Sequence, residues 1–306
     1  LYNLLSGILR SLGDSRTPLM FLVFSSLLNV ALDIVCVVTL QMGVAGAGWA
    51  TLISQLISGL LCLLYMDRKF PILHLKRENL VWRGHCVRRL LIMGLPMGLQ
   101  YSITAIGSIL LQTAVNGLGA VSMAAVAASG KVTGLFASPY DAMGTMAATY
   151  AGQNLGAGKL DRVHHGVKDC CILGVAYSLA ALVVMYFLGA QMTALFLDSK
   201  DVASSAQILP LARQLLVTNA AFYIPLLGVN LFRFTIQGLG YSNLAVIAGV
   251  SEMIARGAVA ALVSVFGFTA VCYASPAAWV LADCFLLPAY FVCMKRRTKE
   301  AAAARE

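Results

Sequence analysis

Eight apolar stretches divide the chain, and each is long enough to cross a lipid bilayer as a helix, since a crossing needs about 20 apolar residues. The predicted spans lie near residues 17–40, 44–66, 91–115, 121–150, 168–197, 207–236, 243–265 and 271–294. Such continuous runs predict α-helices and exclude a membrane β-barrel, whose strands alternate apolar and polar residues. Pro139 and Pro225 fall within two of the spans and are expected to bend them.

The composition predicts an all-α, polytopic membrane protein. Of the 306 residues, 59% are hydrophobic and only 11% are charged, against about 25% charged residues in soluble proteins. The eight cysteines form no C-x-x-C pair, so they predict neither a disulfide scaffold nor a zinc site.

The net charge of +9 is distributed unevenly along the chain. Seventeen Lys and Arg fall on one side of the predicted spans, and only Lys200 falls on the other. Because basic residues stay in the cytoplasm, this asymmetry predicts a multi-pass protein of the cell membrane with a cytoplasmic C-terminus. The charge is an orientation signal, and no nucleic-acid partner is expected.

A shift of 227 residues relates the start of the chain to its end. It aligns Leu12-Gly13-x-Ser15 with Leu239-Gly240-x-Ser242, and Arg68-Lys69 with Lys295-Arg296. Residues 91–294 hold six spans, so residues 1–69 look like the last three spans of an equivalent unit. This predicts two pseudo-symmetric six-helix lobes in a parallel repeat, in a chain that has lost its first three helices.

The predicted organisation has four parts. Residues 1–66 form the remainder of the N-terminal lobe, and 67–90 form a cytoplasmic linker. Residues 91–294 form the C-terminal lobe, and 295–306 form a cytoplasmic tail.

Asn29 and Asp33 lie four residues apart in an apolar span, on one face of the predicted helix. A carboxylate there costs roughly 2.5–3.5 kcal/mol on insertion scales, which indicates a functional use. Asp33 and Thr51 both lie about 10 Å below the outer surface, and Asn3 lies near the level of Asn29. Their oxygen atoms suit Na⁺ or a proton, whereas hydrogen bonding between helices is the simpler alternative for the Asn and Thr side chains.

Other charged residues within the spans are candidates for a substrate cavity. They are Lys131, Asp141, Glu252 and Arg256. Glu252 and Arg256 are spaced i, i+4, so a structural ion pair is the simplest interpretation of these two.

Several motifs occur together in this chain. They are Leu9-Arg10-Ser11-Leu12-Gly13-Asp14-Ser15-Arg16-Thr17-Pro18, Leu28-Asn29-x-x-Leu32-Asp33, Gly43-Val44-Ala45-Gly46-Ala47-Gly48-x-Ala50-Thr51, Gly94-Leu95-Pro96 and Gly152-Gln153-Asn154-Leu155-Gly156-Ala157-Gly158. The combination resembles multidrug and toxic compound extrusion (MATE) transporters, from the fourth helix to the twelfth.

In the DinF-like branch of that family, the resemblance implies a cation site in the N-terminal lobe. The matching residues are Asn3, Asn29, Asp33 and Thr51, together with an Asp on a first helix that this chain does not contain. A site of the NorM-like branch is not expected, because 100–113 and 218–235 contain no acid.

The resemblance implies a secondary active antiporter that exports organic, cationic or amphipathic compounds in exchange for Na⁺ or H⁺. Its expected partners are a small drug-like substrate and membrane lipid, and it is expected to act as a monomer without a cofactor. The alternative is a flippase for lipid-linked precursors, which would need a large cationic groove. An enzyme is not expected, because no G-x-G-D motif follows Tyr140-Asp141 to complete an intramembrane aspartyl protease.

Overall fold

The computed structural model describes residues 2–74, 81–197 and 202–303, and every element within these ranges is helical. The chain divides into two compact units, Leu1–Gly84 and His85–Glu306. The division falls inside the predicted linker, of which residues 75–80 lie outside the described part. Each unit is described by itself.

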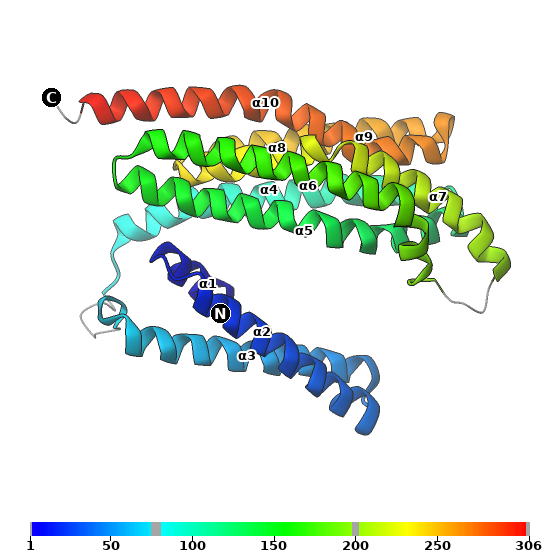
Figure 1. The fold of residues 1–306 in the computed structure, drawn as a ribbon, viewed down its shortest axis with the longest axis horizontal. Helices are drawn as coiled ribbons and strands as arrows, with labels where there is room; N and C mark the ends of the chain where they lie inside the picture. The colour runs from blue at the N-terminus through cyan, green and yellow to red at the C-terminus, as the bar shows by residue number, and fades with distance from the viewer. Residues whose placement is uncertain (1, 75–80, 198–201, 304–306) are drawn as a thin grey trace. The chain divides into compact units, whose positions relative to one another are not determined.

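The first unit is a small helical bundle in which α1 (Tyr2–Ser11) and α2 (Arg16–Asp33) pack against α3 (Gly43–Lys69) (Figure 1). After Asp33 the chain continues as the π-helix η1 (Ile34–Thr39), and the 3₁₀ turn η2 (Pro71–Leu73) follows α3. Small polar residues join α2 to α3: Ser58 Oγ donates to the Phe21 carbonyl at 3.1 Å. Such contacts between helices are typical of membrane bundles.

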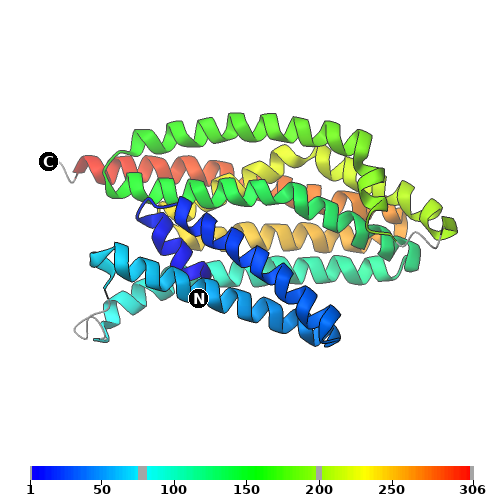
Figure 2. The ribbon, with the colours of Figure 1, turned by 60° about the horizontal axis from the view of Figure 1, so that its bottom comes forward.

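In its described residues, the second unit contains seven helices, most of which run side by side in both views (Figures 1 and 2). They are α4 (Gly84–Asn116), α5 (Ala120–Gly156), α6 (Leu160–Ala194), α7 (Val202–Ala221), α8 (Tyr223–Gly238), α9 (Ser242–Phe266) and α10 (Phe268–Ala303). The largest core contains the fully buried Tyr140, Tyr223 and Tyr290. The Tyr140 hydroxyl lies 2.8 Å from Ser178 Oγ, which satisfies its polar end inside the bundle.

The membrane spans follow the predicted ones closely. In the described residues, seven helical segments are long and apolar enough to cross a membrane, and α7 with α8 makes an eighth if the pair is one span. These two helices are bent by 52°, and Phe222 separates them. Pro225 lies in the first turn of α8, where a missing N–H breaks no helical bond, whereas α5 continues through Pro139.

The predicted repeat reappears in the turn geometry. Gly13 and Gly240, which are 227 residues apart, have φ angles of +90° and +91°. The amide of Asp14 donates to the Leu9 carbonyl at 3.0 Å, and the equivalent amide of Tyr241 donates to the Ile236 carbonyl at 3.1 Å. Both helix ends therefore close with the same left-handed glycine.

Replacing Gly13 by Ala is expected to lower the stability of the protein by about 1 kcal/mol, because φ is positive there. A Cβ at this position meets no atom within 4 Å, so backbone strain is the whole cost. Gly7→Ala is the matched control, since its Cβ also meets nothing within 4 Å and its φ is not positive. Thermal unfolding in detergent should separate the two variants, and equal midpoints would contradict the turn geometry.

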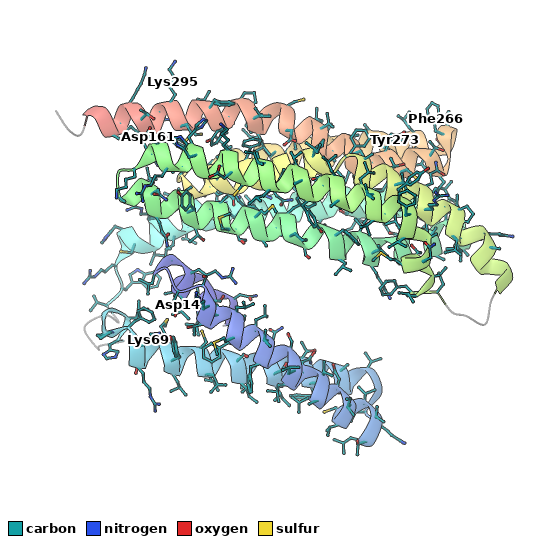
Figure 3. All side chains as sticks on the ribbon, viewed as in Figure 1. Asp14, Lys69, Asp161, Phe266, Tyr273 and Lys295 are labelled. Carbon is teal, nitrogen blue, oxygen red and sulfur yellow. The ribbon has the colours of Figure 1, made fainter. Side chains whose placement is uncertain are left out.

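Asp14 and Lys69 lie at the same end of the first unit (Figure 3). Asp14 accepts the Thr17 amide at 3.1 Å and the Thr17 hydroxyl at 2.7 Å, and the Tyr65 hydroxyl at 3.4 Å. The Thr17 amide is the main reason that the pKa of Asp14 lies below its usual value. Asp14 therefore stabilises the turn above the pKa of the unfolded chain, and this is lost as pH falls through the lowered value.

Candidate functional site

Asp33 stands at the junction between α2 and the π-helix. Its side chain is half-buried, and Oδ1 is shielded with no hydrogen-bond partner among the described residues. A shielded acceptor without a donor costs free energy, so a cation or a proton bound there would stabilise it. The unmet oxygen is the strongest structural sign of a site in the first unit.

The π-helix that follows Asp33 has no counterpart in the sequence predictions. The Leu40 amide donates to the Val35 carbonyl at 2.9 Å, across five residues. A Cβ at Gly46 would lie 3.0 Å from the Cys36 carbonyl group, so α3 approaches the widened turn closely. π-Helical turns are rare in proteins, and those that exist often lie at functional sites. The local residue pattern does not predict this one.

Asn29 and Thr51 meet between α2 and α3. Asn29 Nδ2 donates to Thr51 Oγ1 at 3.4 Å, and Thr51 Oγ1 donates to the Ala47 carbonyl at 2.9 Å. This contact uses the nitrogen of Asn29 and leaves its oxygen available to a cation. The same geometry also fits the simpler alternative of a hydrogen bond that packs two helices.

Asn3 lies apart from this contact. It is exposed on α1, and no hydrogen bond joins it to Asn29, Asp33 or Thr51 in the part of the chain that the structure describes. The structure thus brings Asn29 and Thr51 into contact, with Asp33 one turn away on α2, and does not join Asn3 to them.

In the second unit, Glu252 lies between two arginines. Its Oε2 is 3.2 Å from Arg256 Nη2, and its Oε1 contacts Arg233 Nη2. Glu252 is 3% exposed, and both arginines are also buried. The predicted Glu252–Arg256 pair is therefore present, but Arg233 of α8, which the sequence did not assign, makes it a triad.

Lys131 and Asp141, the other two candidates for a cavity, are exposed on α5. Lys131 Nζ lies 5.4 Å from the centre of the Phe196 ring, a cation–π contact. Asp141 interacts electrostatically with Arg233. Asp141 therefore belongs to the surroundings of the Glu252 triad.

Two neutral amides join α4 to α8, the helices that include residues 100–113 and 223–235. Gln237 Nε2 of α8 donates to Gln100 Oε1 of α4 at 3.0 Å. No group of three or more His, Cys, Asp or Glu that could hold a metal ion occurs in the described ranges.

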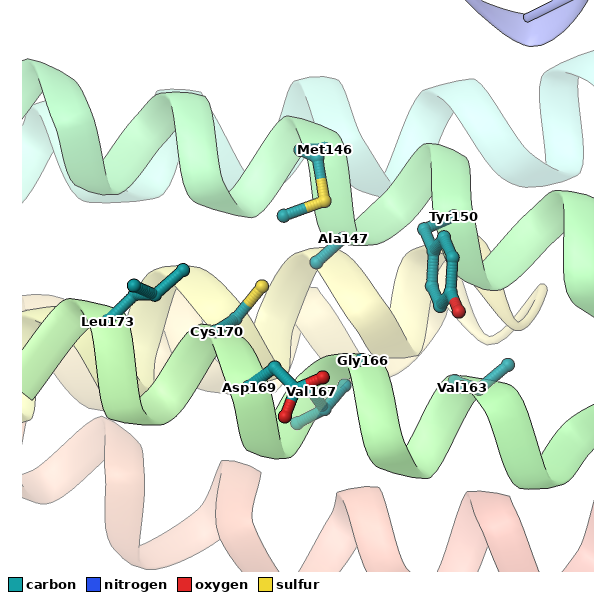
Figure 4. A pocket seen from close by; sticks show the side chains of 9 residues that line it. All are labelled: Met146, Ala147, Tyr150, Val163, Gly166, Val167, Asp169, Cys170 and Leu173. Carbon is teal, nitrogen blue, oxygen red and sulfur yellow. The ribbon is translucent and has the colours of Figure 1, made fainter.

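An apolar pocket of about 300 Å³ lies between α5 and α6 (Figure 4). Met146 and Tyr150 of α5 face Cys170 and Leu173 of α6 across it. Asp169 is the single charged residue in its wall. The pocket contains none of the predicted site residues, and no sequence motif marked it.

Comparison with known proteins identifies the family. A family model described as MatE matches residues 96–274, which is more than half of the chain. The chain therefore belongs to the MatE family of membrane transporters, which is not a class of enzymes.

The chain also resembles two curated relatives in sequence and a solved structure in fold. The chain is 29% identical over 239 residues to "Probable multidrug resistance protein YpnP" of Bacillus subtilis (strain 168), covering 78% of this chain and 51% of YpnP. It is 26% identical over 208 residues to "Probable multidrug resistance protein YoeA" of the same organism, covering 66% and 45%. The crystal structure of MATE in complex with MaL6 shares the fold, with a TM-score of 0.87 at 20% identity over 97% of this chain and 67% of that chain.

The chain spans about half the length of the curated relatives that it matches. Both relatives are described as multidrug resistance proteins, which does not favour the flippase alternative.

Proposed function

We propose that the full-length protein is a secondary active transporter that exports drug-like organic compounds in exchange for Na⁺ or H⁺. Family membership and the descriptions of YpnP and YoeA support drug export. The observation that supports ion coupling is the shielded oxygen of Asp33, which lies in an apolar helix and has no donor among the described residues. Asn29 and Thr51 supply neutral oxygens nearby, as in the DinF-like pattern.

The proposed mechanism is reciprocal. The coupling cation and the substrate each favour one of two conformations, so that binding one promotes release of the other. Asp33 takes up Na⁺ or a proton on one side of the membrane and releases it on the other. The membrane potential supplies about 2.3 kcal/mol per charge for each 100 mV, and the concentration gradient adds to it.

The proposed substrates are cationic or amphipathic compounds. The protein is proposed to transport them as a monomer. The apolar pocket between α5 and α6, with a single acid in its wall, offers the kind of surface that such compounds need. Membrane lipid is the other proposed partner, and no cofactor beyond the coupling ion is proposed.

The proposed location is the cell membrane, with the C-terminus in the cytoplasm. The basic residues support this orientation, seventeen on one side against Lys200 on the other.

Transport of ethidium by the full-length protein in proteoliposomes tests the proposal. An inward Na⁺ gradient and an inward proton gradient are imposed separately, with equal solutions on both sides as the control. We expect ethidium to move against the coupling ion under at least one of the two gradients. Movement that neither gradient accelerates would overturn the proposed antiport.

A further inference from the structure

Asp283 is a membrane-embedded carboxylate that the proposed cation site does not use. It lies about 22 Å from the start of α10 and about 18 Å from Lys295, at 1.5 Å per residue. Oδ1 is shielded and has no partner, and Asp283 forms no hydrogen bond or ion pair with the described residues. A charged carboxylate in such a position is costly, and a proton removes that cost.

The carboxylate is pressed against the backbone of α8. A Cβ on Gly228 would come within 2.4 Å of an Asp283 oxygen, so an alanine there would force the carboxylate to move. One turn earlier on α10, the Trp279 ring packs 6.2 Å from the ring of Tyr223, the first residue of α8. Trp279 and Asp283 therefore contact the same helix, within the first two turns after the break at Phe222.

The charges around Asp283 come from three helices. Arg233 of α8 attracts its carboxylate and Glu252 of α9 repels it; Arg256 is held by Glu252, and Asp141 of α5 interacts with Arg233. No charged side chain in the described parts of α6 and α7 interacts with Asp283. Two arginines face three carboxylates, those of Glu252, Asp141 and Asp283, so a proton on Asp283 leaves the group without net charge.

Arg233, Arg256 and Asp283 each have a buried polar atom without a hydrogen bond to the described residues. Among the described residues, Arg233 Nε and Arg256 Nη1 are buried donors without a partner, and Asp283 Oδ1 is an acceptor without one. Arg233 Nη2 is bound to Glu252, and Arg233 Nε forms no hydrogen bond with Asp283 or any other described residue. An ionised Asp283 would compete with Glu252 for this guanidinium, so the observed arrangement fits a neutral Asp283.

We propose that Asp283 is a proton-binding residue of the second unit, separate from the cation site proposed at Asp33. It binds a proton when Arg233 pairs with Glu252, and it releases the proton when Arg233 turns toward its carboxylate. Because the Asp283 carboxylate lies against Gly228 of α8, each protonation or deprotonation of Asp283 alters the contact between α8 and α10. The proposal stands whether or not Asp33 binds the coupling ion.

The fluorescence of Trp279 tests this inference in the full-length protein, freed of other tryptophans. Within this chain, Trp49→Phe and Trp82→Phe leave Trp279, one turn from Asp283, as the reporter. We expect its emission to change in one step between about pH 4 and pH 9, and Asp283→Asn to abolish that step. Asp33→Asn and Asp161→Asn are the matched controls, since Asp161 is an exposed acid in the first turn of α6, and both should retain the step.

Two results would overturn the proposal: the absence of a step in the parent protein, or a step that persists in Asp283→Asn. A step caused by His164, which lies 3.3 Å from the Tyr290 hydroxyl on α10, would persist in that way.

A second variant decides the question if Asp283→Asn does not fold. Gly228→Ala displaces the carboxylate and should move the midpoint of the step. Gly257→Ala is the control, since its Cβ would meet only Leu110 Cδ1 at an ordinary 3.8 Å. Equal midpoints for the two alanine variants would also overturn the proposal.

Discussion

Replacing Asp33 by Asn is expected to reduce ion-driven export of ethidium by the full-length protein to the background rate. The amide has nearly the shape of the carboxylate, but it carries no charge to bind Na⁺ and takes up no proton near neutral pH. The amount of protein in the membrane should not fall, because a neutral amide costs less than a carboxylate in an apolar helix. Transport is measured in proteoliposomes with matched protein content.

Asp161→Asn is the control for this variant, since Asp161 is an exposed acid in the first turn of α6. It should transport ethidium at the rate of the unmodified protein. Normal coupled export by Asp33→Asn would rule out Asp33 as the coupling residue, while leaving drug export itself untouched.

Replacing Glu252 by Gln is expected to destabilise the protein by about 3–5 kcal/mol, because it leaves two buried arginines without their counter-charge. Both guanidinium groups bond to this single carboxylate, which is 3% exposed. A lower midpoint of thermal unfolding in detergent would reveal the loss.

Glu300 provides a matched control on the same chain. It also binds two arginines, Arg296 at 3.2 Å and Arg297 at 2.7 Å, but it is exposed to solvent. Glu300→Gln should therefore leave the unfolding midpoint nearly unchanged. If the two variants unfold at the same temperature, Glu252 does not hold the arginines as described.

A triple variant separates lost charge balance from lost packing. Replacing Arg233, Glu252 and Arg256 together by Met removes every charge of the triad and keeps most of its volume. It should be more stable than Glu252→Gln, because no arginine of the triad remains buried without its counter-charge.

The local features that the sequence predicted depend on interactions within one segment. A run of apolar residues must pair its own backbone groups in hydrocarbon, so its length indicates a helix. The predicted span 44–66 lies within α3, and 243–265 lies within α9. Likewise, the repeated Leu-Gly-x-Ser marks the two turns at Gly13 and Gly240, because a left-handed residue at a helix end favours glycine wherever the helix packs.

The candidate site was predictable only in part. The spacing of Asn29 and Asp33 follows from helix geometry, and depth placed Thr51 opposite them. Depth along a helix axis does not fix the rotation of the helix about that axis. Asn3 was therefore predicted at the depth of Asn29, but it does not take part in the contact between Asn29 and Thr51.

The sequence alone determined the class of this protein: a multi-pass helical chain with an acid inside an apolar span. Tertiary structure alone decided which charges meet. Arg233 interacts with three acids, Asp141, Glu252 and Asp283. The packing of α8 against α9 places its guanidinium in an ion pair with Glu252. An ion pair between helices depends on their rotation and separation, which arise from contacts distant in sequence. The sequence likewise did not predict the π-helix after Asp33 or the contact between Asp283 and Gly228, because both involve packing between different helices.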